Sequence, residues 1–252
     1  MKLLTLARDL KRRKARERQR AFAVEGVRAV EELIRSSVRV HGVLVAAQLS
    51  DAPRGAALLV ELRVRGADVV EVSPLEFASA AETESPQGVL AVAEIPAWTP
   101  EGLVVPPRAR LIVLDAVQDP GNVGTILRTA AALGASAVLA TPGTVDLWNA
   151  KVVRSAMGAH FRMPAMACSW ASLDELCART ALALWGADAG GRALDSLDRP
   201  DRLALLMGNE GTGLSQDARE RADQIVALPI SAIVESLNVA VATGIFLYQL
   251  RT

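Results

Sequence analysis

The spacing of apolar residues predicts regular elements along the first part of the chain. Between residues 22 and 36, valine, leucine and isoleucine recur every three or four positions, the spacing of one buried helix face. The apolar run 40–46 predicts a strand. The same order then repeats, with helices expected over 55–65 and 74–80 and strands over 68–72 and 88–93. Helices that alternate with strands in this way predict a small α/β sandwich over residues 1–95.

A proline-rich stretch separates this part from a second pattern. Residues 96–107 contain four prolines, a composition typical of an interdomain linker. Over 108–252, helical stretches separate most of the short apolar runs, which are 111–117, 137–140, 181–185, 203–207 and 225–230. Such runs are typical of buried parallel strands, so we expect a doubly wound α/β domain with a mostly parallel sheet. Ligands bind such sheets at the carboxyl ends of the strands.

Charge is distributed unevenly along the chain although the totals cancel. There are 28 basic and 28 acidic residues, but the first twenty positions hold nine basic and only two acidic side chains. No apolar leader follows this basic run, and no uncharged stretch is long enough to span a membrane, so a cytoplasmic protein is expected. Two cysteines and two histidines fit neither a disulfide framework nor a metal-binding spacing, and no bound metal is expected.

The loop after the run 111–117 carries residues suited to binding an anion. A turn leads to Asn122, the expected N-cap of a helix whose buried stripe leaves Arg128 on another face, one turn beyond Gly124. An arginine at this place can hold a phosphate through two parallel hydrogen bonds. A salt-bridged surface arginine would give the same pattern, so both interpretations stay open.

A second loop, rich in glycine, follows the run 203–207. It begins at Gly208, and its three glycines let the backbone pass close to a ligand, although an ordinary turn has the same composition. It matches neither the dinucleotide-binding nor the P-loop fingerprint. Glu210 lies inside this loop and needs a partner, for which Arg128 and Asn238 are candidates.

The third loop follows the run 225–230 and leads into the last helix. Ser236 is the expected N-cap of this helix, and the free amides behind it suit carboxylate or phosphate oxygens. The helix is crowded with small residues, so another backbone can come close to it. A capped, packed terminal helix without a ligand is the alternative.

Together the three loops resemble the three motifs of the SpoU/TrmH family of RNA ribose methyltransferases. The matching stretches are DPGNVGTILRTA at 119–130, MGNEGTGL at 207–214, and LPI at 228–230 followed by ESLNV at 235–239. Their joint order and spacing are far more specific than any one loop. The stretch KVVRSAMGAHF at 151–161 resembles the linker helix between the first two motifs. The first part, with FAVEG at 22–26 and TESPQGVL at 83–90, resembles the ribosomal-protein-like substrate-binding domain of many members.

The resemblance implies a trefoil-knotted methyltransferase domain over 108–252 that binds S-adenosylmethionine. At the matching positions the cofactor is held by the backbone of Gly208, Leu228 and Leu237. Arg128 is implied to bind the phosphate beside the target ribose and to favour the developing alkoxide. The implied polar shell that orients it comprises Asn122, Glu210, Ser236 and Asn238. A homodimer is implied as well, in which the partner's Arg128 completes each active site.

The implied reaction is methyl transfer to a ribose 2′-hydroxyl of RNA, with ribosomal RNA favoured by the domain layout. Two features depart from the family: a glycine is usual where Ala232 stands, and a net charge of zero is unusual for an RNA-binding protein. The basic first twenty residues are therefore expected to supply RNA contacts, although a solvated helix face has the same composition. The alternatives are a tRNA ribose methyltransferase and a non-catalytic RNA-binding ribosome-assembly factor. A nucleotide-dependent dehydrogenase would need a glycine fingerprint that this chain lacks.

Overall fold

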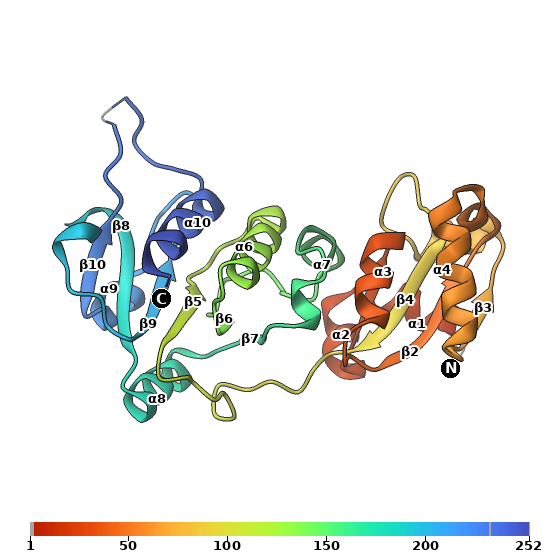
Figure 1. Ribbon diagram of the computed structural model, residues 1–252, viewed down its shortest axis with the longest axis horizontal. Coiled ribbons are helices and arrows are strands. Elements are labelled where there is room, and N and C mark those ends of the chain that lie inside the picture. The colour runs from red at the N-terminus through yellow and green to blue at the C-terminus, as the bar shows by residue number, and fades with distance from the viewer. Residues whose placement is uncertain (1–2, 232, 252) are drawn as a thin grey trace. The chain divides into compact units, whose positions relative to one another are not determined.

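The chain folds into two compact units, which are described one at a time. The computed structural model describes residues 3–231 and 233–251 (Figure 1). Ala232, the site of the departure from the family motif, lies outside the described residues. The first unit comprises the chain up to Ala97 together with Trp148–Arg162, and the second comprises Trp98–Leu147 and the chain from Met163 onward.

Two segments lie elsewhere than the boundaries 1–95, 96–107 and 108–252 expected from the sequence. Most of the proline-rich stretch belongs to the second unit, where Leu103 is buried in the core. The segment Trp148–Arg162 belongs to the first unit. Its Trp148 ring lies 4.6 Å from the ring of Phe22, and its Arg162 pairs with Glu32 at 2.7 Å. The chain therefore passes between the units three times.

The first unit is an α/β sandwich built on a four-stranded sheet, as predicted. The strands are β1 (Ala21–Glu25), β2 (Val40–Val45), β3 (Val69–Glu71) and β4 (Val89–Glu94), in the order β1-β4-β2-β3. Strand β4 runs antiparallel to β1 and β2, and β2 and β3 are parallel. The helices are α1 (Leu3–Asp9), α2 (Arg13–Gln19), α3 (Val27–Ile34), α4 (Pro53–Val64), α5 (Pro74–Ala80) and α7 (Ala150–Ser155), with short 3-10 turns at Ala47–Asp51 and Ala159–Phe161.

Strand β1 corrects one expectation from the sequence. The spacing of apolar residues predicted a helix over 22–36, but the first residues of this stretch form a strand that pairs with β4. The pairing runs from Ala21 opposite Glu94 to Glu25 opposite Leu90. Val24 fits the helical spacing that continues through Val27, but the burial of both Phe22 and Val24 has the period of two that a strand requires. Gly26, with a φ of 102°, ends the strand, and only then does α3 begin. Pairing with β4 decided between the two patterns.

The second unit contains a six-stranded, entirely parallel sheet, which confirms the predicted fold class. The strands are β5 (Ala109–Leu114), β6 (Ala137–Ala140), β7 (Ala165–Ala167), β8 (Ala183–Ala193), β9 (Arg202–Met207) and β10 (Gln224–Ala227), in the order β10-β8-β9-β5-β6-β7. The helices are α6 (Pro120–Ala132), α8 (Trp170–Thr180), α9 (Gln216–Arg221) and α10 (Val239–Leu250), with a 3-10 turn at Leu194–Ser196. The three-residue strand β7 was not predicted.

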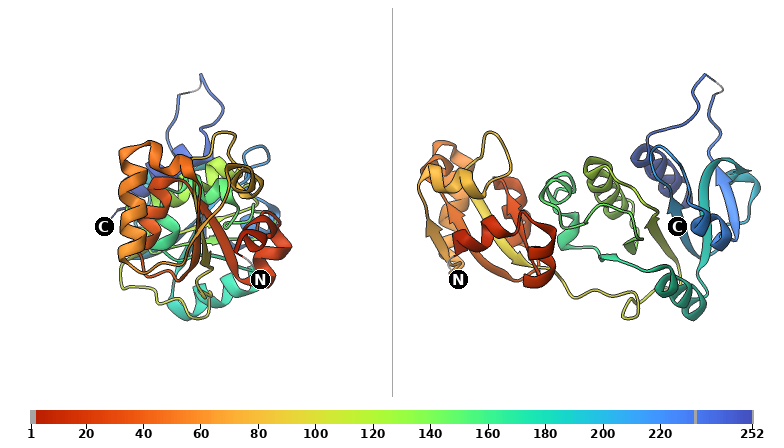
Figure 2. Two further views of the ribbon diagram at one scale, coloured as in Figure 1. Left: turned by 90° about the vertical axis from the view of Figure 1, so that its right-hand side faces the viewer. Right: turned by 180° about the vertical axis from the view of Figure 1, so that it is seen from behind.

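Helices cover the sheet of the second unit and leave its carboxyl edge to the loops. Buried residues of α8 and α9, such as Leu173 and Ala218, pack with Leu111 and Val113 of β5 in one core cluster. Helices α6 and α10 lie side by side in both views of the ribbon (Figures 1 and 2). Within the described residues, no helix has the length and apolarity needed to cross a membrane.

A buried arginine ties the end of α10 to the start of the central strand. The side chain of Arg110 is only 9% exposed, and its Nε donates a hydrogen bond to the Leu250 carbonyl at 2.7 Å. Its Nη1 also donates to the carbonyls of Ala109 and Asp201. Burial lowers the pKa of the guanidinium, and the nearby carboxylate of Asp201 partly offsets this effect.

Candidate active site

The first loop begins where β5 ends, at the carboxyl edge of the sheet. Ala116 has a positive φ of 54°, which turns the chain toward α6. Asp119 caps this helix, because its carboxylate accepts a hydrogen bond from the Asn122 amide at 2.8 Å, and Pro120 occupies the first turn. The prediction that Asn122 is the N-cap was therefore wrong. Asn122 lies within the first turn, and its side chain bonds to other loops.

Arg128 lies further along α6 on an exposed face. The buried face of this helix is formed by Val123, Ile126, Leu127 and Ala130. Within residues 3–231 and 233–251, no hydrogen bond or ion pair engages the Arg128 side chain. The expected contact between Arg128 and Glu210 is therefore not formed. The arginine is exposed and uncompensated, which leaves its guanidinium available to a phosphate.

The second loop is a tight turn held together by Asn209. Its backbone pairs with Gly213 in both directions, at 2.9 and 3.0 Å, and its Oδ1 accepts hydrogen bonds from the amides of Gly211 and Thr212. Its Nδ2 donates to the Ala116 carbonyl at 2.8 Å, which ties this loop to the first. Gly208 has no room for a side chain, since a Cβ there would lie 2.3 Å from the carbonyl carbon of Gly213.

Glu210 is held by three donors from the first loop. Its Oε1 accepts from the Asn122 side-chain amide at 3.0 Å and from the Asp119 backbone amide at 3.1 Å, and its Oε2 accepts from the Gln118 amide at 3.2 Å. Burial raises the pKa of Glu210, but these hydrogen bonds outweigh it, so the pKa lies below its ordinary value. Glu210 is thus an anionic acceptor at neutral pH.

The third loop joins the same cluster through Asn238. Asn238, and not the expected Ser236, is the N-cap of α10, because its Oδ1 accepts from the amides of Ala240 and Val241 at 2.9 and 3.3 Å. Its Nδ2 donates to the Oδ1 of Asn122 at 2.9 Å. Glu210, Asn122 and Asn238 therefore form one chain of bonds, in which Asn122 is the central member. Ser236 is exposed and makes no side-chain hydrogen bond within the described residues.

Two residues that support the second loop were missed from the sequence. One is Asn209, whose signal was its place directly after Gly208 in the glycine-rich loop. The other is Asp115, a carboxylate only 2% exposed, which accepts a hydrogen bond from the Ser215 amide at 2.6 Å. Because Asp115 ends an apolar run, a buried carboxylate at the carboxyl edge of the sheet could have been recognised as unusual.

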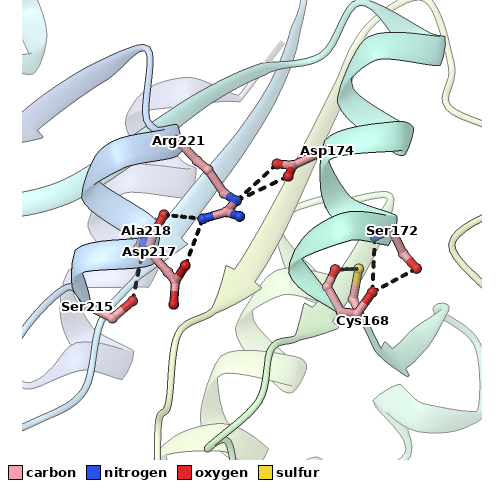
Figure 3. A network of polar contacts seen from close by, with 8 residues as sticks. Cys168, Ser172, Asp174, Ser215, Asp217, Ala218 and Arg221 are labelled. Carbon is pink, nitrogen blue, oxygen red and sulfur yellow. Dashed lines mark hydrogen bonds and ion pairs between the residues drawn. The ribbon is translucent and has the colours of Figure 1, made fainter.

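Helix α9, which follows the second loop, is anchored at both ends. Figure 3 shows Ser215, whose Oγ accepts from the Ala218 amide at 3.1 Å, and Arg221, whose guanidinium bonds to Asp174 of α8 and to Asp217. The Arg221 guanidinium also lies 5.2 Å from the centre of the Trp170 ring. These contacts fix the far end of the loop that carries Glu210.

The backbone at the three expected cofactor positions is compatible with a ligand. Gly208 is buried, and Leu228 and Leu237 are partly buried. Among the described residues, none of the three uses its backbone N–H or carbonyl in a hydrogen bond outside regular elements. Buried polar backbone groups normally find a partner, so Gly208 fits a ligand bound through main-chain contacts, and the backbone of Leu228 and Leu237 is free to join it. No cluster of metal-binding side chains occurs in the part of the chain that the structure describes.

Two family models match the two parts of the chain. The model of the SpoU rRNA Methylase family matches residues 109–248. The model of the MRM3-like substrate binding domain matches residues 5–91. The first match covers all three loops of the site, and the second covers most of the first unit.

Relatives match over nearly the whole chain. The sequence is 36% identical to 23S rRNA (guanosine(2553)-2'-O)-methyltransferase RlmP of Bacillus subtilis over 97% of this chain and 94% of the relative. It is 34% identical to 23S rRNA (guanosine-2'-O-)-methyltransferase RlmB of Xanthomonas campestris over 90% of this chain and 94% of the relative.

Solved structures agree with these relatives. The SpoU Methyltransferase AviRb from Streptomyces viridochromogenes in complex with the cofactor AdoMet gives a TM-score of 0.88 at 29% identity, covering 99% of this chain and 97% of that one. An AdoMet bound rRNA methyltransferase from Sinorhizobium meliloti gives 0.84 at 27% identity, covering 99% and 94%. The chain belongs to the SpoU rRNA methylase family.

Proposed function

We propose that this protein transfers a methyl group from S-adenosylmethionine to a ribose 2′-hydroxyl of ribosomal RNA in the cytoplasm. The observation that carries the proposal is the chain of bonds from Glu210 through Asn122 to Asn238, which joins the three motif loops. Both relatives named above are 23S ribosomal RNA methyltransferases by name, which favours ribosomal RNA over tRNA. A non-catalytic assembly factor would not need this polar cluster together with an uncompensated Arg128.

S-adenosylmethionine would be held by the backbone at Gly208, Leu228 and Leu237. When bound, its sulfonium would supply an electrophilic methyl carbon for the ribose 2′-oxygen, the sulfur would leave as a neutral thioether, and the hydroxyl proton would pass to solvent. The protein must then chiefly align the ribose and lower the free energy needed for the hydroxyl to lose its proton. The trefoil knot that the family resemblance implies stays a prediction.

Arg128 is the group best suited to assist the hydroxyl. As a permanent cation with a planar fork it binds the phosphate next to the ribose and stabilises negative charge that develops on the 2′-oxygen. It does not serve as a base, because a guanidinium does not give up its proton at neutral pH. Asn122, Glu210 and Asn238 hold the three loops together, and exposed Ser236 is available to bond the incoming RNA.

A homodimer is the second part of the proposal. Helix α10 carries an exposed apolar stripe of Val241, Ile245 and Tyr248, which are 52%, 37% and 55% exposed and share one face. A stripe of this kind favours association with another copy, and Arg128 is then free to reach the partner's site. Co-expressed subunits with different tags, one carrying Arg128→Ala and the other Glu210→Ala, should regain transfer if the site combines both chains. Inactive mixed dimers would contradict this arrangement.

The reaction is tested with RNA from a strain that lacks the gene. Purified protein and radiolabelled S-adenosylmethionine should label ribosomal RNA at a ribose 2′-oxygen, mapped by its resistance to alkaline cleavage. Label on tRNA alone would favour the alternative substrate, and a protein that binds no S-adenosylmethionine in calorimetry would favour the assembly factor.

The role of Arg128 is tested in the same assay. Arg128→Ala should abolish transfer while affinity for S-adenosylmethionine stays nearly unchanged, and Arg128→Lys should recover only part of the activity because it lacks the fork. Unchanged turnover of Arg128→Ala would refute the role given to this residue.

A further inference from the structure

The positive charge of the chain is concentrated in its first twenty residues. These hold nine of the 28 basic and two of the 28 acidic residues, which leaves 19 basic and 26 acidic residues, a net charge of −7, for the rest of the chain. RNA is a polyanion, and its attraction to a protein depends on neutralising phosphates. The first twenty residues are therefore the part of the chain whose net charge attracts RNA.

This segment is folded into the first unit. Ala7, Leu10 and Ala15 are 0%, 2% and 4% exposed, so both α1 and α2 contribute to the core. Ala7 and Leu10 lie in one cluster with Phe77 of α5 and Leu44 of β2. The cations of α1 and α2 are therefore held at fixed positions. Deleting the segment would expose this core, so single side chains have to be tested instead.

Some of these cations serve the fold. Arg16 is 4% exposed, and its guanidinium donates hydrogen bonds to the carbonyls of Leu10 at 2.7 Å and Lys11 at 3.0 Å, where the turn between the helices lies. The Nζ of Lys11 donates to the Ala81 carbonyl at 2.7 Å. These side chains are occupied by carbonyls of the protein, and they are not the ones to expect on RNA.

Others are exposed but already have acidic neighbours. Arg12 pairs with Asp9, and Arg13 pairs with Glu17 at 2.8 Å. The arginines of these pairs are 72% and 63% exposed, so the pairs are weak in water. Each pair nevertheless neutralises one positive charge locally. The arginine of the pair therefore attracts a phosphate less strongly.

Lys14 and Arg18 differ from all of these. Both are exposed, and across residues 3–231 and 233–251 neither side chain has a hydrogen bond or ion pair. They are four residues apart on α2, so they share one face with Cβ atoms about 5–6 Å apart. Like charges at this spacing repel each other and destabilise a helix unless an anion lies over them. Adjacent phosphates of a nucleic-acid strand supply such anions.

We propose that the exposed face of α2 that carries Lys14 and Arg18 binds the sugar–phosphate backbone of the RNA substrate. This assignment of the ligand rests on the proposed function. It agrees with the match of residues 5–91 to a substrate-binding domain. Backbone contacts position an RNA without reading its sequence, so this face sets affinity and leaves the choice of nucleotide to other residues.

The test compares two charge-neutralised double variants of the full chain. Lys14→Gln/Arg18→Gln removes the proposed contacts, and Arg39→Gln/Arg63→Gln removes two positive charges from side chains of the same unit that are 77% and 58% exposed. Affinity for protein-free large-subunit ribosomal RNA is measured over a series of salt concentrations. Melting temperature and affinity for S-adenosylmethionine are measured beside it, and so is turnover at saturating RNA.

Loss of two phosphate contacts should reduce the slope of log affinity against log salt by about 1.5 and weaken binding roughly tenfold to fiftyfold at 0.1 M salt. Cofactor affinity and turnover at saturating RNA should stay at wild-type values, and the melting temperature should equal the wild-type value or lie slightly above it because the repulsion is removed. The control variant should keep the wild-type slope. A Lys14→Gln/Arg18→Gln protein with the wild-type slope would overturn the proposal. So would an equal loss in the control variant. Because binding is measured without methyl transfer, a wild type that binds RNA but transfers nothing contradicts the proposed reaction and still allows this comparison.

Discussion

Asn122 is the side chain on which contact between the three loops depends. Its Nδ2 donates to Glu210 at 3.0 Å, and its Oδ1 accepts from Asn238 at 2.9 Å. Asn122→Ala removes both bonds. The backbone of α6 should be unaffected, because Asp119 caps this helix. The substitution therefore separates the loops without unwinding the helix.

The structure sets the size of the effect. A hydrogen bond to an ionised carboxylate contributes about 1.5–3 kcal/mol, and one between neutral groups contributes about 0.5–1.5 kcal/mol. Glu210 and Asn238 are exposed, so water replaces part of each lost bond, and we expect the low end of the sum, about 2 kcal/mol. If that free energy is lost from the transition state, kcat/KM falls about thirtyfold.

Transfer of a tritiated methyl group to ribosomal RNA measures this loss. Thr125→Ala is the matched control, since it removes a hydroxyl from the same helix whose hydrogen bond, among the described residues, is to the Gly121 carbonyl. Combining Asn122→Ala with Glu210→Ala completes a cycle in which the two losses should be strongly non-additive. Wild-type kcat/KM in Asn122→Ala, or losses that simply add, would refute the view that these side chains act as one chain of bonds.

Three further predictions concern the same unit. Gly208→Ala should displace the second loop, because the new Cβ would meet Gly213 at 2.3 Å, and calorimetry should show affinity for S-adenosylmethionine reduced about tenfold or more. Arg110→Met leaves the Leu250 carbonyl without its donor and should lower the free energy of unfolding by about 2–4 kcal/mol in urea, with faster hydrogen exchange in α10; an unchanged midpoint would speak against this contact. Because the pKa of Glu210 is lowered, its ionised form stabilises the folded protein at pH values above the ordinary pKa of 4.5, and this stabilisation is lost as the pH falls through the lowered pKa. Glu210 therefore does not change its charge across the neutral range, and cofactor affinity should be constant there. A neutral-range inflection that disappears in Glu210→Gln would contradict that assignment.

The local sequence pattern predicted those elements whose structure is set by neighbouring residues alone. Helix α5 and strand β6 occur over 74–80 and 137–140, as predicted, because the first has a capping box and the second is an uninterrupted apolar run. Strand β1 was mistaken for helix because Val24 lies three residues before Val27 and continues the helical spacing, whereas the pairing with β4 is not visible in the local pattern. Helix caps were misplaced by two or three residues for a similar reason. In each loop several residues can cap, and contacts with other loops decide which one does.

Contacts between loops were beyond any local pattern. Asn122 and Glu210 are 88 residues apart, and Asn122 and Asn238 are 116 apart. Their meeting depends on the order of the strands in the sheet and on the packing of α6 beside α10. The family resemblance brought the right residues together, but it left the pairing open. The expected partners of Glu210 were Arg128 and Asn238, whereas the structure gives it Asn122 and two backbone amides.

That pairing leaves both Glu210 and Arg128 without a charged partner among the described residues. A cation that must receive a phosphate loses affinity if a carboxylate of its own chain already neutralises it. Glu210 is satisfied by three donors, which weakens its attraction for a further cation. Asn122 therefore has a second effect besides joining the loops, because it supplies one of the donors that satisfy the Glu210 carboxylate. In Asn122→Ala, Glu210 loses one donor and becomes more open to the Arg128 that the proposed dimer brings into the same site, so adding Glu210→Gln should recover RNA affinity even though the loops stay separated.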